Sequence, residues 1–290
     1  MEAKNWHDRN YKKLLFIPLI LIIFSFVYLI NFDSNNGDIF YKDVSLTGGT
    51  SVTVFEKADI TMLESSLETR LSDLTVRGTY NIFTGEQKGF VVETISDSDE
   101  AKDAIEDVLD IELIDGDNAD IISTGSRFSE GFHRQLLIAV LIAFIFMAIV
   151  IFIIFRTAVP SLAVIISAFA DILFTLVTFD ILGMKMSTAG IVAFLMLIGY
   201  SVDTDVLLTT RLLKRHEGSV NSRIMSSMKT GMTMTLTSLF AFLAALFVVK
   251  SFSVELTQIF TILVIGLAYD LLNTWVTNVS ILKWYVEAKK

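Results

Sequence analysis

Residues 135–155 read QLLIAVLIAFIFMAIVIFIIF, a run without a single charged side chain. As an α-helix this run is about 30 Å long, which matches the hydrocarbon core of a bilayer. It therefore predicts a membrane-spanning helix, and the rest of the chain holds five more runs of this kind. The six predicted spans are 14–30, 135–155, 158–182, 188–212, 232–250 and 254–283.

The first span has the basic flank of a signal peptide, because it follows Lys12 and Lys13. No small-x-small cleavage site comes after it, since residues 30–33 read Ile-Asn-Phe-Asp, so we expect a retained anchor. The two prolines, Pro18 and Pro160, lie near the starts of predicted helices. We therefore expect no internal break in any span.

The segment 31–133, between the first and second spans, is strongly acidic. It holds 22 Asp and Glu against 7 Lys and Arg, whereas the rest of the chain holds 16 basic and 10 acidic residues. Such a balance makes nucleic acid an improbable partner. The absence of cysteine excludes disulfides, thiolate metal sites and cysteine nucleophiles.

Lysine and arginine near the ends of the spans predict the orientation. In the predicted topology 13 of them lie on the side of the termini and only Arg134, Lys185 and Lys250 on the other. Since basic residues stay in the cytoplasm, we expect residues 1–13, the loop 213–231 and residues 284–290 to be cytoplasmic. The acidic segment 31–133 is then outside, and the protein belongs in the cell membrane.

Within the acidic segment, alternating and helical hydrophobic patterns predict a small α+β domain. Strands are expected at 50–55, 74–83, 89–95 and 119–124, and helices at 59–74 and 97–110. The order βαββαβ predicts a ferredoxin-like fold, which hosts many functions and implies none.

Acidic residues within the spans are the main functional candidates, because a carboxylate at mid-bilayer costs about 2.5 to 3.5 kcal/mol. Asp180 is near the outer end of its helix and is expected to be interfacial. Counted from the basic boundaries, Asp171, Asp203 and Asp270 lie about 16 to 22 Å deep and could share one layer. The candidates for a proton relay are Asp203, Asp205, Asp171 and Asp270.

Asp203 and Asp205 cannot both face one cavity, because residues two apart on a helix point about 200° apart. We favour Asp203, since Gly199 one turn earlier would admit a neighbouring helix. The supporting polar candidates are Ser201, Thr204, Thr230, Thr233, Thr237 and Asn273. The alternative is that all these groups only hydrogen-bond between helices and fix their packing.

Enzymatic alternatives have little support. The histidines are His7, His133 and His216, all outside the predicted spans, and no phosphate-binding GxxxxGK[ST] loop occurs. Tyr269-Asp270 matches half of an intramembrane aspartyl protease signature, but its second half, Gly-x-Gly-Asp, is missing. We expect no enzyme activity, no cofactor and no metal site.

Three motifs resemble the SecF family of protein-export membrane proteins, a branch of the resistance-nodulation-division superfamily, over essentially the whole chain. Asp43-Val-Ser-Leu-Thr-Gly-Gly-Thr50 is similar to the family's Asp-x-x-x-x-Gly-Gly-Thr signature, through Asp43, Gly48, Gly49 and Thr50. The fourth span carries the family's Ile-Gly-Tyr-Ser stretch and trailing arginine, as Gly199, Tyr200 and Arg211. Lys229-Thr230-Gly-Met-Thr233 resembles the start of its fifth span.

Two departures point to an archaeal-type member. The acidic residue of bacterial SecF aligns with Thr204, so Asp203 and Asp205 flank the usual position. Val202-Asp203 followed by Val206-Leu207 looks more like the partner subunit SecD, which leaves open which carboxylate acts.

The resemblance implies an accessory subunit that pairs with SecD and uses the proton gradient to draw an unfolded polypeptide out of the SecYEG channel. A lipid or drug transporter half of the same superfamily is the first alternative. Against it, such pumps usually carry two six-helix units and larger external modules. A passive membrane scaffold or chaperone is the second.

Overall fold

The computed structural model describes residues 11–80, 84–214, 218–250 and 253–289. The predicted N-terminal stretch up to residue 10, the end of the second predicted strand at 81–83, and His216 lie outside these ranges. Among the described residues, six helices are long and apolar enough to span a membrane, as the sequence predicts. They are Tyr11–Asn36, Gly131–Phe155, Ala158–Ile181, Thr188–Lys214, Val220–Val249 and Val254–Ala288.

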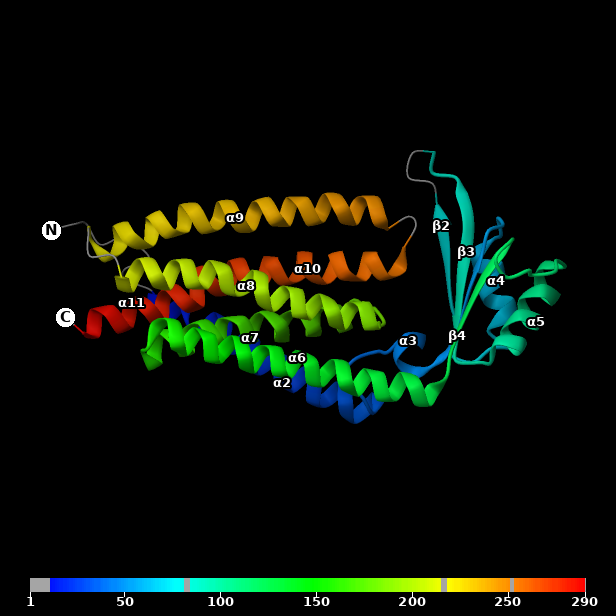
Figure 1. The fold of residues 1–290 in the computed structure, drawn as a ribbon, viewed down its shortest axis with the longest axis horizontal. Coiled ribbons are helices and arrows are strands. Elements are labelled where there is room, and N and C mark those ends of the chain that lie inside the picture. The colour runs from blue at the N-terminus through cyan, green and yellow to red at the C-terminus, as the bar shows by residue number, and fades with distance from the viewer. Residues whose placement is uncertain (1–10, 81–83, 215–217, 251–252, 290) are drawn as a thin grey trace.

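The membrane helices lie side by side in one elongated bundle, with α11 at the end far from the sheet (Figure 1). The elements of this bundle are α2 (Phe16–Asn36), α6 (Ser126–Phe155), α7 (Ala158–Ile181), α8 (Thr188–Lys214), α9 (Val220–Val249), α10 (Val254–Leu272), η1 (Asn273–Asn278) and α11 (Val279–Ala288).

Several helices are longer than the hydropathy predicts, and α2 and α9 show how their ends are set. α2 continues beyond residue 30 to Asn36, where Gly37 closes it in the left-handed conformation at φ 76°. α9 begins at Val220 rather than 232, because the side chain of Ser219 caps it by accepting the Ser222 N–H. Much of the predicted cytoplasmic loop 213–231 is therefore helical.

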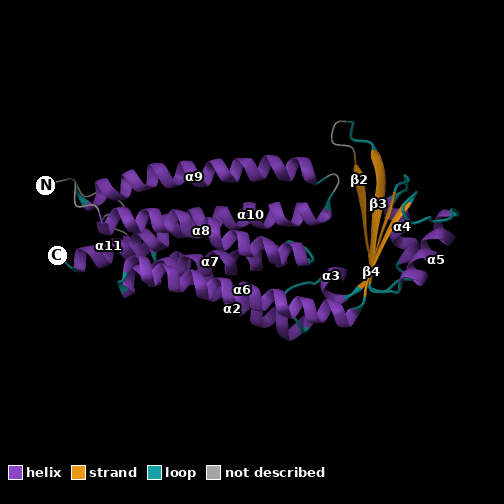
Figure 2. Ribbon diagram, viewed as in Figure 1, coloured by secondary structure: helices purple, strands orange, loops and turns teal. Residues whose placement is uncertain are grey.

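A four-stranded sheet with two helices lies between α2 and α6. Its strands stand in the order β2-β3-β1-β4, and every neighbouring pair is antiparallel. Figure 2 shows α4 and α5 on the face of the sheet that points away from the bundle. The elements are α3 (Val44–Thr47), β1 (Gly49–Val54), α4 (Ile60–Leu67), β2 (Thr75–Tyr80), β3 (Gln87–Thr94), α5 (Ser98–Leu109) and β4 (Ala119–Thr124).

The strands and helices of this domain follow the predicted βαββαβ order, but α4 is shorter than the predicted helix 59–74. It ends at Leu67, and Asp73 has a positive φ of 50°, which a continuing helix would not allow. Leu71 and Leu74 still reach the core beneath α4 and α5. The spacing of these leucines therefore reflects their burial in this core and does not indicate a continuing helix.

α7 and α8 are the most buried membrane helices, whereas α2, α6 and α9 expose most of their apolar side chains. α8 and α10 pack closely where Gly266 of α10 meets Leu197 of α8. A Cβ at Gly266 would lie 2.4 Å from Leu197 Cδ1. The absence of a side chain at this position therefore allows the two helices to approach.

The expectation of unbroken spans is wrong for the sixth one. Residues Asn273–Asn278 form a π-helix between α10 and α11, although no proline or glycine lies there. Such segments are rare and occur mostly as short insertions in α-helices, often at functional sites. Here the cause lies in tertiary contacts, because four of its six residues bury polar side chains inside the bundle.

Candidate functional site: a carboxylate cluster within the bundle

Three carboxylates from three helices are fully buried at the centre of the bundle. Asp171 lies on α7, Asp205 on α8 and Asp270 on α10, each with 0% exposure. Among the described residues, no ion pair involves any of them. Burying uncompensated charge is costly, so their surroundings and protonation decide whether this arrangement is stable.

Asp171 is the carboxylate with both oxygens hydrogen-bonded. The Ser201 hydroxyl of α8 donates to Oδ2, and the side-chain amide of Asn273 donates to Oδ1 at 2.6 Å. Ser201 and Asn273 are two of the predicted supporting residues, and the structure places both in direct contact with a carboxylate. This carboxylate therefore ties α7 to α8 and to the π-helix.

Asp205 receives its partners on one oxygen only. Thr274 Oγ1 lies 2.8 Å and Asn278 Nδ2 lies 2.7 Å from Asp205 Oδ1. The other oxygen, Oδ2, is buried without a hydrogen-bond partner in the described part of the chain. Asn278 is a site residue that the sequence reasoning missed.

Asp270 shares the hydroxyl of Thr274 with Asp205. Its Oδ1 lies 3.2 Å from Thr274 Oγ1, and its Oδ2 has no hydrogen-bond partner within the described ranges. A hydroxyl has one hydrogen to donate, so it cannot serve two ionised carboxylates fully. A proton on Asp270 would complete a chain in which Asp270 donates to Thr274 and Thr274 donates to Asp205.

Three residues of the π-helix contact the carboxylates, namely Asn273, Thr274 and Asn278. In an α-helix residues five apart point about 140° apart, at about 100° per residue. In a π-helix the hydrogen bond joins residues i and i+5, so these residues are about one turn apart. The π geometry therefore lets Asn273 reach Asp171 while Asn278 reaches Asp205.

The preference for Asp203 over Asp205 as the inward carboxylate is wrong. Asp203 is exposed and lines a surface cavity with Arg211, Lys214 and Met234. The two carboxylates do point apart, as predicted, but the buried face of α8 is the one that carries Ser201 and Asp205. In the described part of the chain, a Cβ built on Gly199 would meet no neighbouring helix within 4 Å, and Gly199 is exposed.

The predicted threonine stripe of α9 also faces outward. Thr233 and Thr237 are exposed, and each hydroxyl donates to the backbone carbonyl four residues earlier. Thr230 instead accepts a hydrogen bond from Arg211, at 3.0 Å. The predicted Thr204 is buried against Thr235, with 3.3 Å between their hydroxyl oxygens. Thr204 and Thr230 therefore join α8 to α9, apart from the carboxylates.

The structure also places Asp180 and Tyr200. Asp180, expected at the membrane interface, is only 2% exposed in the last turns of α7. Tyr200 packs its ring edge against Phe242 of α9 and is 38% exposed. Among the described residues, no three His, Asp or Glu side chains are grouped so that they could hold a metal ion.

Comparisons with known proteins identify the family. The family described as "Protein export membrane protein SecD/SecF, C-terminal" matches residues 108–288. Protein-export membrane protein SecF of Methanocaldococcus jannaschii is 39% identical over 286 residues, with 96% of each chain covered. The SecF of Methanolacinia petrolearia is 35% identical over 280 residues, covering 95% of this chain and 94% of its own.

Solved structures share the fold. The crystal structure of SecDF, a translocon-associated membrane protein from Thermus thermophilus, matches with a TM-score of 0.74 and 19% identity. The match covers 98% of this chain and 39% of the SecDF chain. A super-membrane-facing form of SecDF matches with a TM-score of 0.57. With its six spans and these relatives, this multi-pass membrane chain belongs to the SecF protein-export membrane proteins of the SecD/SecF family.

Proposed function

We propose that this chain is a non-enzymatic accessory subunit of protein export, acting with a SecD-like subunit beside the SecYEG channel on an unfolded polypeptide. Family membership and the likeness to a translocon-associated SecDF support this proposal. The exposed apolar faces of α2, α6 and α9 leave ample surface for lipid and for a membrane partner.

Coupling to the proton gradient is the mechanistic part of the proposal. The observation that carries it is the single hydroxyl of Thr274 between Asp205 and Asp270. Adding or removing one proton changes which polar groups of the three helices have a hydrogen-bond partner. A protonation step can therefore bias the bundle between two arrangements, provided that the two arrangements bind the proton with different affinity.

The proposed orientation keeps both termini in the cytoplasm and residues 31–133 outside. The unequal lysine and arginine counts on the two sides support it. The sheet order β2-β3-β1-β4 and the helices on one face support a ferredoxin-like domain at the outer end. In this orientation the domain is well placed to meet a polypeptide leaving the channel.

Asp205→Asn tests the proposed function, and Asp203→Asn on the same helix is its matched control. We expect Asp205→Asn to abolish the gradient-dependent part of precursor export, because an amide cannot take up and release the proton. Asp203→Asn should leave export unchanged, since Asp203 lies outside the cluster. Export is measured in energised membrane vesicles with and without a protonophore.

The amount of assembled complex is measured in the same membranes. If Asp205→Asn lowers assembly but export per assembled complex is normal, the passive scaffold is correct and proton coupling is wrong. Equal loss in both variants would contradict the assignment of the cluster as the coupling site.

A further inference from the structure

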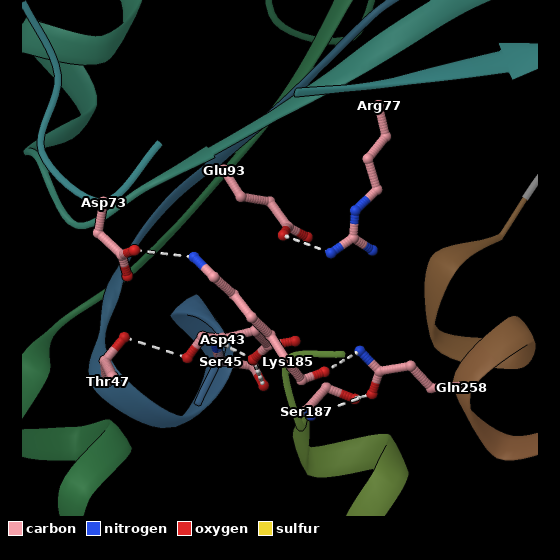
Figure 3. Close-up of polar contacts among 9 residues, drawn as sticks. All are labelled: Asp43, Ser45, Thr47, Asp73, Arg77, Glu93, Lys185, Ser187 and Gln258. Atoms are coloured by element: carbon pink, nitrogen blue, oxygen red, sulfur yellow. Dashed lines mark hydrogen bonds and ion pairs between the residues drawn. The ribbon is translucent and has the colours of Figure 1, made fainter. Parts of the chain in front are cut away.

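The start of α8 donates hydrogen bonds to two other parts of the chain. The first backbone N–H groups of any helix lack partners within the helix. Here the Ser187 N–H donates to Gln258 Oε1 at 3.0 Å (Figure 3). The Thr188 N–H donates to Ser45 Oγ at 3.0 Å. The Gly190 N–H is capped locally, by Ser187 Oγ at 3.1 Å.

Ser45 links this helix start to the root of the sheet domain. Its hydroxyl accepts from Thr188 and donates to Asp43 Oδ1 at 2.6 Å, and its backbone N–H donates to the same oxygen at 2.9 Å. Asp43 is 6% exposed. Burial raises the pKa of Asp43, and the two hydrogen bonds from Ser45 oppose that rise. A negative charge behind Ser45 also suits the positive end of the α8 dipole.

Backbone contacts reinforce the link. The Asp43 N–H donates to the Met186 carbonyl at 3.0 Å, and the Met186 N–H donates to the Tyr41 carbonyl at 2.6 Å. The chain entering the domain is thereby paired with the loop before α8. Met186 itself is buried, at 1% exposure.

Gln258 adds α10 to this joint, by which we mean the contacts between the root of the sheet domain and the start of α8. Its side-chain oxygen accepts both the N–H and the hydroxyl of Ser187, and its amide donates to the Lys185 carbonyl at 2.8 Å. Gln258 is 2% exposed, on the first turns of α10. One side chain therefore fastens the starts of α8 and α10 together.

The Gly-Gly-Thr part of the motif brings the chain close against the neighbouring strand β3. Gly48 and Gly49 both have positive φ, 83° and 143°, and a Cβ on Gly49 would lie 2.3 Å from the Thr94 carbonyl oxygen. Thr50 then donates to the Ser96 carbonyl at 3.0 Å. The short helix α3 thus passes directly into the strand β1, which lies between β3 and β4.

We propose that Asp43 and Ser45 form an external cap on α8 which, together with Gln258, makes the sheet domain move as one body with α8 and α10. These helices carry Asp205 and Asp270, so a rearrangement at the carboxylates is transmitted to the domain through this cap. The transmission rests on the proposed proton coupling, whereas the cap itself does not. Asp43 and Ser45 are therefore positioning residues.

The test measures the distance between the domain and the bundle. Because the chain has no cysteine, spin labels can be placed through Ser65→Cys on α4 and Phe247→Cys on α9 in lipid nanodiscs. We expect Ser45→Ala and Asp43→Asn to broaden the distance distribution. The matched control is Thr47→Ala, since that hydroxyl donates to the backbone oxygens of Asp43 and Gly48 and not to the Asp43 carboxylate.

Ser45→Thr keeps the hydroxyl and should restore the narrow distribution, which separates loss of the cap from a general folding defect. If Ser45→Ala gives the same distribution as Thr47→Ala and the parent chain, the proposed role of the cap is contradicted.

The second measurement is export in cells whose own copy of the gene is deleted. We expect Ser45→Ala to lose gradient-dependent export although Asp205 is intact, and Ser45→Thr to retain it. A broadened distribution with normal export would overturn the transmission step. If Asp205→Asn leaves export unchanged while Ser45→Ala still broadens the distribution, the proposed proton coupling fails and the cap stands.

Discussion

At the residue scale, the hydroxyl of Thr274 is the group on which the carboxylate cluster depends. It is within hydrogen-bond distance of both Asp205 and Asp270, and both of these carboxylates hold a second oxygen without a described partner. A buried charge that loses a hydrogen bond is destabilised by about 1.5 to 3 kcal/mol. The cluster is therefore sensitive to a change of one atom.

Thr274→Val replaces this hydroxyl by a methyl group of similar size. We expect a lower unfolding temperature in detergent and weaker gradient dependence of export, because two carboxylates lose the same donor. Thr274→Ser keeps the hydroxyl and serves as the control. Equal behaviour of the valine and serine variants would show that the hydroxyl does not link the two carboxylates.

At the element scale, the joint between the sheet and the bundle contains a second buried carboxylate. Glu93 on β3 is 7% exposed, and its carboxylate lies 3.7 Å from the guanidinium of Arg77 on β2. Figure 3 shows the two side chains facing each other. Burial raises the pKa of Glu93 and Arg77 opposes the rise. Asp43 and Glu255 raise it further, and Lys185 lowers it. The face of the sheet that is not covered by α4 and α5 points towards the bundle, and Glu93 is thus a titratable group on that face.

The raised pKa predicts how the sheet responds to pH. The folded state binds the Glu93 proton more tightly than the unfolded state, so this residue favours folding at low pH. That contribution is lost as pH rises through the folded pKa. Glu93→Gln should remove this decline in stability with rising pH. Glu64→Gln on the exposed face of α4 should keep it.

Hydrogen exchange of β2 and β3 in the full chain, corrected for its intrinsic pH dependence, measures this effect. A decline of equal size in the parent chain and in Glu93→Gln would assign it to another group.

At the scale of the whole molecule, the sheet domain lies at one end of the bundle and α11 at the other (Figure 1). In the proposed orientation these ends lie on opposite sides of the membrane. Orientation depends on lysine and arginine near short loops, and the sheet domain contributes little to it because aspartate and glutamate have little effect.

A cysteine-free chain allows a direct topology test. Ser65→Cys on α4 should react with a membrane-impermeant maleimide in intact cells, and Ala288→Cys at the end of α11 only after permeabilisation. The reverse pattern would place the sheet domain in the cytoplasm and contradict the proposed contact with an emerging polypeptide.

The sequence by itself determined the six spans and the βαββαβ order, because hydropathy and alternation are properties of neighbouring residues. It also identified Asp171, Asp205 and Asp270 as candidates, since a charge in a membrane span is visible without a structure. The three family motifs, read in order along the chain, were enough for the family.

Only the tertiary structure decided which face of α8 is inside. Asp203 and Asp205 are equally acidic and two residues apart, and the choice depends on how α7 and α10 pack against α8. The π-helix and the cap at Ser45 escape local patterns for the same reason. Asn278 reaches Asp205 across 73 residues of sequence, and Ser45 reaches Thr188 across 143. Contacts between residues so far apart form only when the helices are assembled.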